Sequence, residues 1–295
     1  MSASNSPGLD HALGLDHVGI AGADLSALAA TYEKLGFQLT PLARHAGKRT
    51  QDGPVVPFGT GNRCIMLRQG YLELIAIVDP GAFSNTLDRF LARYAGIHII
   101  ALNVADADSN LARLRRAGFD VPGIAYLERP VDDADPTGPR AKFARLPLPD
   151  APEGRIQLIQ HLTPEAIWQE RFLSHPNSAV ALEDVVLVVA DSAEAAARFS
   201  RLAGQPVVPD PMGGFSLDLP HGRVRLVAEN VLEKIFPGVV APALPYVAGV
   251  SLRTFDQNAA IVRIAAAHSI ATHPVSGGLL IPPAAAGGAA LRFLA

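Results

Sequence analysis

The sequence has one cysteine, Cys64, among 295 residues. A single cysteine excludes an internal disulfide and indicates a reducing compartment. Cys64 lies in the apolar segment RCIML, so we expect its thiol to pack as a small hydrophobe rather than to act as a nucleophile. The N-terminal segment also lacks the basic and then apolar run of a secretion signal, and we therefore expect a cytoplasmic protein.

Charge and long apolar runs are also scarce. Only 18% of the residues are charged, the formal net charge is −3, and Lys and Arg are scattered along the chain. Such a chain offers no basic stripe for a phosphate backbone, which argues against a nucleic-acid partner. The longest apolar stretch, residues 235–250, contains three prolines and is shorter than the ~20 residues of a membrane-spanning helix. We expect a connecting loop there and no membrane partner.

A faint fourfold repeat is the most informative feature that is present. An apolar strand start, an Ala-rich helix and further apolar segments recur from Leu15, Gly96, Leu182 and Gly249. Each copy is typical of a strand, a helix and then three strands, which predicts an α+β fold of four βαβββ modules. The chain length and the apolar content of 49% fit about two domains.

The helices of the first two copies show helical periodicity. Residues 25–37 place apolar side chains at helical spacing after Asp24, which is suited to cap the helix. In the second copy, a helix ending near Gly118 has Asp108 or Ser109 as its candidate cap.

Four motifs connect the repeat to a known family. They are LDHVGIA at residues 15–21, GTGNR at 59–63, GYLELIA at 70–76, and QHLTPEAIW followed by HPN between 160 and 177. Together with the paired βαβββ units they resemble the bacterial glyoxalase-like domain proteins of the vicinal oxygen chelate (VOC) superfamily, which includes glyoxalase I, extradiol dioxygenases and antibiotic-resistance proteins. The resemblance implies two half-barrel domains, an N-terminal one over 1–170 and a degenerate C-terminal one over 171–295.

One carboxylate stands in an otherwise apolar strand of the first copy. Glu73 lies in YLELIAI, where burying a charge without a partner would cost on the order of several kcal/mol. A metal ion, a proton or a cation must therefore accompany Glu73, and Arg63 or Arg145 is an alternative partner to a metal. His17 is the matching polar residue on the opening strand.

The resemblance implies a metal site in the N-terminal half-barrel, because in the superfamily the first and last strand of each copy each donate one ligand. The corresponding residues are His17, Glu73, His98 and Gln157. Imidazole and carboxylate ligands suit one divalent ion, which could be Zn, Ni, Co, Mn or Fe.

His98 has a register problem. It precedes Phe119 by 21 residues, whereas His17 precedes Phe37 by 20. Because a slip of one residue reverses the face of a strand residue, His98 needs a bulge or a connection one residue longer to face the site. His161 is an alternative ligand or substrate contact, although its QHLTPE setting also fits the start of a helix.

Further polar residues are candidates for substrate binding. His45, Asn62 and Arg63 lie in the donor-rich segment before and around GTGNR and could orient an oxygen-rich substrate. The polar, Pro-rich segment 128–140 predicts a flap over the site.

The second half does not repeat the ligand set. Its corresponding positions hold Asp184, Arg225 and Ser251, with Leu291 or Arg292 at the end. We therefore expect a structural role for this half, as a cover for the first domain or as the face of a possible homodimer, although Arg225 and Arg253 could contact a ligand.

These features predict a metal-dependent enzyme of the lyase or isomerase type. The metal would polarise a small substrate that carries neighbouring oxygens and stabilise its enolate or enediolate, with Glu73 as the candidate proton shuttle. Two alternatives stay open: a metal-free protein that binds or sequesters a small molecule, and a non-haem Fe(II) ring-cleaving dioxygenase.

Overall fold

The computed structural model describes residues 10–295 apart from 50–52, 133, 136 and 149–150. The elements of the first half run β1 (Ala12–Ala21), α1 (Leu25–Lys34), β2 (Ala43–Lys48), β3 (Val55–Met66), β4 (Tyr71–Ile77), α2 (Leu87–Leu91), β5 (Gly96–Val104), α3 (Ala107–Arg116), β6 (Ala125–Pro130), β7 (Arg140–Leu148) and β8 (Arg155–His161). Strand, helix and three strands thus follow one another twice, with α2 between the two runs.

The second half has the same order of elements. After the short connecting helices α4 (Pro164–Ile167) and η1 (Glu170–Phe172) come β9 (Ala179–Val188), α5 (Ser192–Ala203), β10 (Val208–Pro209), β11 (Phe215–Asp218), β12 (Arg223–Val227), α6 (Glu229–Ile235), β13 (Tyr246–Thr254), α7 (Ala259–Ala267), β14 (His273–Val275), β15 (Gly278–Ile281), η2 (Pro283–Ala285) and β16 (Ala290–Leu294). The fold is α+β and rich in sheet, as the repeat predicts.

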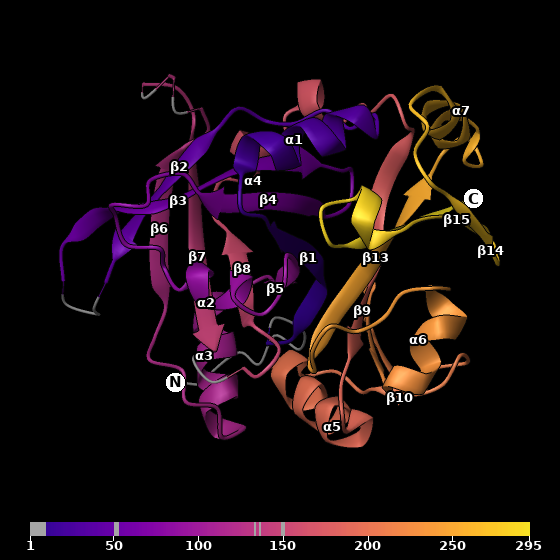
Figure 1. Cartoon of the computed structure of the whole chain (residues 1–295). Helices are drawn as coiled ribbons and strands as arrows, with labels where there is room; N and C mark the ends of the chain where they lie inside the picture. Colours follow the sequence, from indigo (N-terminus) through magenta and orange to yellow (C-terminus); the bar gives the residue numbers. More distant parts are fainter. Residues whose placement is uncertain (1–9, 50–52, 133, 136, 149–150) are drawn as a thin grey trace.

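Strand pairing arranges both halves alike. In the first half, β1 lies beside β5 in an antiparallel pair, and each of them pairs in parallel with the last strand of its own run, β4 and β8. In the second half, β9 and β13 form the equivalent antiparallel pair, flanked by β12 and β16. Figure 1 shows the halves side by side, indigo to magenta and orange to yellow. Ile97 of β5 pairs with Val247 of β13, and the isolated bridges Gly14–His221 and Gln69–Ala181 also join the halves. The domain boundary at residue 170 stays a prediction.

Alternation along the strands separates a helix-covered face from a curved inner face. Val18 and Ile20 of β1 join Tyr32 of α1 in the largest apolar cluster, which includes residues of both halves. His17 and Gly19 point the other way because successive strand residues alternate. Cys64 is buried, and burial raises the pKa of its thiol to about 12, which agrees with a packing role.

The caps explain where the helices start. Asp24 accepts hydrogen bonds from the backbone N–H groups of Ser26 and Ala27, as the sequence predicts for α1. The predicted cap of α3 was wrong, because the extended Asp106 accepts from the N–H of Ser109 and starts the helix two residues earlier.

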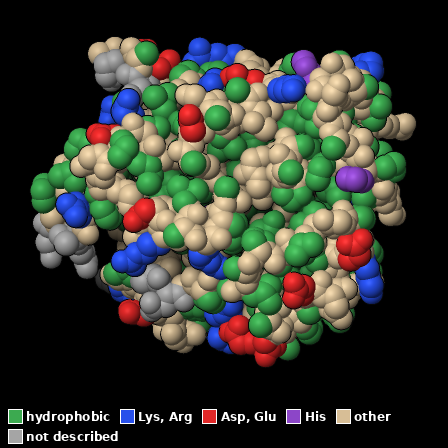
Figure 2. All heavy atoms as spheres, in the orientation of Figure 1, with side chains coloured by type: hydrophobic (Ala, Val, Ile, Leu, Met, Phe, Trp, Pro, Cys, Tyr) green, Lys and Arg blue, Asp and Glu red, His purple; other side chains and the backbone are tan. Residues whose placement is uncertain are grey.

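The surface agrees with a low and mixed charge. On the face shown in Figure 2, basic and acidic side chains are scattered around the rim, with apolar and neutral atoms between them. Within the described residues, no helix is long and apolar enough to cross a lipid bilayer.

Candidate functional site

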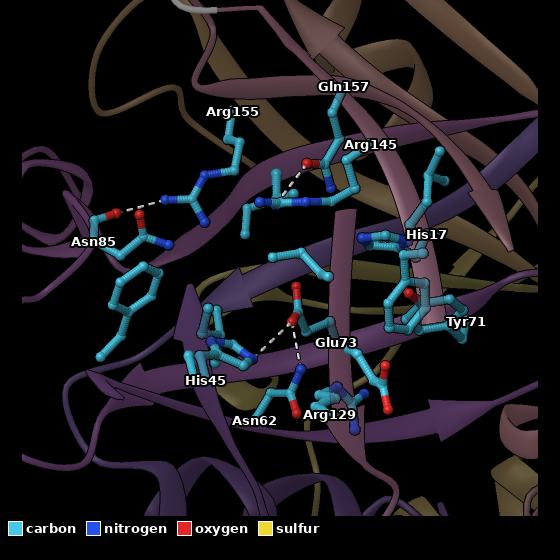
Figure 3. A pocket seen from close by; sticks show the side chains of 18 residues that line it. His17, His45, Asn62, Tyr71, Glu73, Asn85, Arg129, Arg145, Arg155 and Gln157 are labelled. Atoms are coloured by element: carbon cyan, nitrogen blue, oxygen red, sulfur yellow. Dashed lines mark hydrogen bonds and ion pairs between the residues drawn. The ribbon is translucent and has the colours of Figure 1, made fainter. Parts of the chain in front are cut away.

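A cavity lies on the inner face of the first half, which we call the first cup. Its wall includes residues of β1, β4, β5 and β8 and of the hairpins β2–β3 and β6–β7, so the sheet curves around it. The cavity offers about 100 Å³ to the centres of water-sized molecules. A single water needs on the order of 10–15 Å³ by this measure, so several waters or a small organic molecule can fit. Figure 3 shows Glu73 near its centre.

His17 enters this cavity with its ring held by a neighbour in the chain. Its Nδ1 lies 2.6 Å from Oδ1 of Asp16, and its ring stacks on Tyr71 with the centroids 4.4 Å apart. Consecutive strand residues normally face opposite ways, but the β1–β5 register shifts between Leu15 and His17, which is a bulge at Asp16. The bulge brings the carboxylate to its neighbour's ring.

Asp16 also holds the second histidine of the region. Its Oδ2 lies 2.8 Å from Nε2 of His161, and the carboxylate is only 4% exposed. Burial alone would raise the pKa of Asp16, but the two histidines outweigh burial and hold the pKa well below its usual range. Because an ionised carboxylate only accepts hydrogen bonds, Nδ1 of His17 donates to Asp16, and Nε2 is the ring nitrogen that Asp16 does not hold.

Glu73 is bound by polar side chains from β2 and β3. The Asn62 amide donates to Oε1 of Glu73 at 2.5 Å, and Nε2 of His45 lies 3.8 Å from the same oxygen. Burial raises the pKa of Glu73, but His17, His45 and the Asn62 hydrogen bond outweigh it, so the pKa is lowered overall. Glu73 is therefore a carboxylate at neutral pH.

His45 is held in its neutral form. Its Nδ1 lies 2.9 Å from Oγ1 of Thr60. Burial and then the positive charges of Arg129, Arg155 and Arg145 lower the pKa of His45 to about 4, although Glu73 acts in the opposite direction. At neutral pH the residue is thus a polar contact and not a cation.

Three arginines line the cavity, and sequence reasoning gave none of them a binding role. Arg155 of β8 donates to the carbonyl of Asn85 at 2.6 Å, and Arg145 of β7 donates to Oε1 of Gln157 at 3.1 Å. Arg129 of β6 lies over the ring of Phe143. The alternation that places Gln157 inside the cup also places Arg155 there, so the pattern of β8 could have indicated Arg155.

His98 does not join the cavity. The β1–β5 register shifts again between Gly19 and Ile20, opposite His98, yet the ring is turned toward Tyr94, whose carbonyl lies 2.8 Å from Nε2. It stacks between Tyr94 and Phe90, and burial lowers its pKa to about 4. Ile99 lines the cavity instead, and it precedes Phe119 by the same 20 residues that separate His17 from Phe37.

Two other candidate residues also lie outside the cavity lining. Arg63 donates to Glu33 at 3.0 Å and to the carbonyl of Thr40, on the strand face opposite Asn62. His161 lies behind the wall, where it contacts Asp16 and the rings of the lining residues Tyr71 and Phe143. Neither Arg63 nor Arg145 lies within ion-pair distance of Glu73 in the described part of the chain, so neither of the predicted ion pairs forms.

The predicted flap contributes to the cavity wall. Within the segment 128–140, Glu128 and Arg129 line the cavity from the end of β6. Glu128 is also paired with Arg140, at 2.5 Å, and with Lys142, at 3.6 Å. Residues 133 and 136 of this segment lie outside the described residues.

The resemblance implies a metal site with four ligands, one from each of β1, β4, β5 and β8. His17 and Glu73 face the cavity together, but the third position holds Ile99 and the amide oxygen of Gln157 is bound by Arg145. No group of three or more His, Cys, Asp or Glu side chains suited to a metal is found among the described residues. The residues present therefore do not fit the four-ligand site.

Comparisons with known proteins agree with the fold and with the motifs. A sequence model of the glyoxalase-like domain matches residues 15–203. The chain belongs to the glyoxalase-like domain family. It is thereby a member of the VOC superfamily, which confirms the resemblance seen in the sequence. No curated protein is significantly similar to it in sequence.

Solved structures with this fold cover nearly the whole chain. A hypothetical protein from Staphylococcus aureus has a TM-score of 0.63 at 15% identity, with 95% of this chain and 98% of that chain covered. A Mn(II)-bound glyoxalase from Novosphingobium aromaticivorans has a TM-score of 0.55 at 13% identity, covering 96% and 82%. A mutant of 4-hydroxymandelate synthase from Streptomyces coelicolor has 0.55 at 13%, covering 90% and 78%. At these identities the similarity concerns the fold alone.

Proposed function

We propose that this glyoxalase-like domain protein catalyses a proton transfer next to the carbonyl of a small oxygen-rich substrate, in an isomerase or lyase reaction that passes through an enolate. The observation that carries the proposal is the Asp16–His17 pair, 2.6 Å long, at a bulge beside the cavity. A general base must carry a free basic nitrogen and be held in one orientation. The Asp16 carboxylate supplies the orientation, and Nε2 of His17 is the base.

The surroundings of His17 support this chemistry. When Nε2 takes a proton, the imidazolium is stabilised by the buried Asp16 carboxylate. The positive charges of Arg145 and Arg155 favour an enolate over the neutral ketone, since fixed charges act strongly in a site with little water. Glu73 is ionised and can accept a proton from a second position on the substrate, which keeps it a candidate proton shuttle.

Metal chemistry has weaker support than the proton transfer. One structural relative is a Mn(II)-bound glyoxalase and another is a catechol 2,3-dioxygenase. A divalent ion in this chain would have His17 and Glu73 as its ligands, and a dioxygenase would need a second histidine where Ile99 stands. The proposed proton transfer therefore uses only groups of the protein itself.

Solvent deuterium exchange tests the proposal without knowledge of the final product. Small 2-oxo acids, 3-oxo acids and 2-hydroxy ketones are incubated in D₂O with the protein, and the loss of the α-proton signal is followed by ¹H NMR. We expect His17→Gln and Asp16→Asn to slow exchange by roughly 10²–10⁴-fold, the usual contribution of a general base. The exposed His268→Gln, in the second half, is the matched control and should exchange like the wild type.

Two results would contradict the proposal. One is exchange in His17→Gln at the wild-type rate, and the other is no wild-type exchange with any compound. Tight binding of one of these compounds without exchange would support the second candidate, a protein that only binds its ligand. The loss of the third ligand position to Ile99 favours that candidate, because a binding protein needs no complete metal site.

A further inference from the structure

Arg145 and Arg155 carry charges that the protein does not neutralise by direct contact. In the described part of the chain, no Asp or Glu oxygen lies within ion-pair distance of either guanidinium, and their only hydrogen-bond acceptors are neutral oxygens. Nε of Arg145 is buried and has no hydrogen-bond partner at all among the described residues. Arginines in protein interiors are normally paired, so this pair lacks an anion.

The side chains that line the cavity carry more positive than negative charge. Among the described residues, the cavity is lined by three arginines, Arg129, Arg145 and Arg155, and by two carboxylates, Glu73 and Glu128. Glu128 is engaged by Arg140 and Lys142, and Glu73 by Asn62. Burial and then the charge of Arg155 lower the pKa of Arg145 to about 10, although the charge of Glu73 acts in the opposite direction.

Figure 3 shows how the two arginines lie in the cavity. Arg145 and Arg155 extend side by side into the cavity on the side opposite His45 and Asn62, with Glu73 between. The carbonyl of Asn85 fixes Arg155, and Gln157 fixes Arg145, so both guanidinium groups are held in place before a ligand arrives. Planar guanidinium groups suit the two oxygens of a carboxylate.

Part of the cavity wall is apolar. Ile75, Ile99 and Ile159 line it from three strands, and Phe58 and Phe143 from two others. A ligand that matches this wall has one anionic end and an apolar body.

We infer that the first cup binds a small carboxylic acid, with its carboxylate held by Arg145 and Arg155 and its apolar body against the isoleucines. This inference deepens the proposed function by naming the class of substrate, and it rests on the same cavity. It assigns Arg145 and Arg155 as specificity-determining residues.

Isothermal titration calorimetry tests the inference with matched ligands. The probes are 4-methyl-2-oxopentanoate and benzoylformate, each compared with its neutral methyl ester, and sulfate is the control for a general anion site. We expect each acid to bind at least tenfold more tightly than its ester, a difference of about 1.4 kcal/mol. Equal binding of acid and ester, binding of sulfate as tight as that of the acids, or no binding of either acid at 10 mM each overturns the inference.

Variants distinguish a specific contact with Arg145 and Arg155 from a general attraction of anions to the positive charge of the protein. Arg145→Gln and Arg155→Gln should each weaken acid binding at least tenfold and leave the ester unaffected. Arg155→Lys keeps the charge but loses the planar contact, so it should bind with intermediate affinity. Arg263→Gln removes a charge from an exposed side chain of α7 in the second half and should bind like the wild type. Binding that is unchanged in both Gln variants, with thermal melting showing that they are folded, contradicts the inference.

The binding result is independent of the proton-transfer test. Acid binding that depends on the arginines, without deuterium exchange, keeps this inference and rejects the proposed catalysis. If deuterium exchange depends on His17 but acids and esters bind equally well, the proposed proton transfer stands and the inferred carboxylate site is rejected.

Discussion

The two halves have the same strand register, but polar side chains line a cavity in the first half and pair with one another in the second. In the first cup, His17, Glu73 and Gln157 surround a cavity. The equivalent positions of the second half, which we call the second cup, hold Asp184, Arg225 and Arg292. Arg225 makes two hydrogen bonds to Asp210, at 2.6 and 2.7 Å, and Arg292 donates to Asp184 at 3.0 Å.

Apolar side chains complete the difference. In the second cup, Leu232 and Ile235 of α6 and the following Phe236 pack against Val186 and Val188 of β9. In the first half the equivalent helix α2 contributes Leu87 to the buried cluster next to the cavity, and its Phe90 and Leu91 are partly buried against that cluster. The comparison teaches that polar residues on the inner face indicate a functional site only where their charges are not neutralised by one another.

The largest expected effect comes from breaking the charge network of the second cup. Arg225→Met leaves the buried Asp210 without its hydrogen-bonded cation and removes a second cation, 3.9 Å away, from the buried Asp184, so it should lower the free energy of unfolding by about 3–5 kcal/mol. Arg145→Met, in the first cup, removes a charge that has no paired carboxylate and should stay within about 1 kcal/mol of the wild type. Urea denaturation at pH 7 measures both. Equal losses in the two variants would remove the distinction between the cups.

Acid sensitivity should arise from the buried His98 of the first half. Its folded pKa of about 4 lies below the 6.5 of the free side chain, so the unfolded chain takes up a proton at a higher pH than the folded one. This difference leaves stability intact above pH 6.5 and lowers it as the pH falls toward 4, by about 3 kcal/mol in total.

His98→Phe keeps the ring stack and should flatten the slope of unfolding free energy against pH between 6.5 and 4. Phe90→Leu alters the same stack without removing the titrating group, and it should keep the wild-type slope. A slope that is unchanged in His98→Phe would show that the acid sensitivity comes from other groups, such as His45.

The fold could be predicted from the sequence because every copy repeats the same local pattern. The apolar alternation and the helix-ending glycines, such as Gly36 and Gly118, are local signals. The position of Asp106 shows the limit of such signals, since three acidic or hydroxyl residues near one helix start could each cap it.

The site was less predictable because it depends on register. His17 and Glu73 lie on regular parts of β1 and β4, and alternation alone places them on the inner face. Asp16 reaches His17 only through a bulge, and the bulge opposite His98 does not turn its ring into the cavity. A bulge shows no clear pattern in a single sequence. Arg145 was expected only as a partner of Glu73, and Arg155 was not singled out, because exposed arginines are common and the missing partners of these two become visible only in three dimensions.

Introducing the two missing metal ligands into the first cup should give it a metal affinity that the second cup lacks. Ile99→His with Gln157→Glu places two ligands beside His17 and Glu73, at the positions that the register makes equivalent to them. We expect this double variant to bind Mn(II) or Zn(II) at least tenfold more tightly than the wild type, a gain of about 1.4 kcal/mol. Elemental analysis of untagged protein after dialysis measures the bound metal, with Glu73→Ala as the comparison. Near-stoichiometric metal in the wild type, lost in Glu73→Ala, would instead support the metal-dependent enzyme.

The smallest effect is expected for the exposed ion pair of the second half. Arg253 donates to Glu183 at 2.6 Å, but its side chain is 52% exposed, so water screens the attraction and competes for both groups. Arg253→Ala should therefore lower the free energy of unfolding by no more than about 1 kcal/mol, and less in 0.5 M NaCl. Urea denaturation beside Arg225→Met checks this. A loss as large as that of Arg225→Met would mean that the burial of the second-cup charges is not what makes their pairing important for stability.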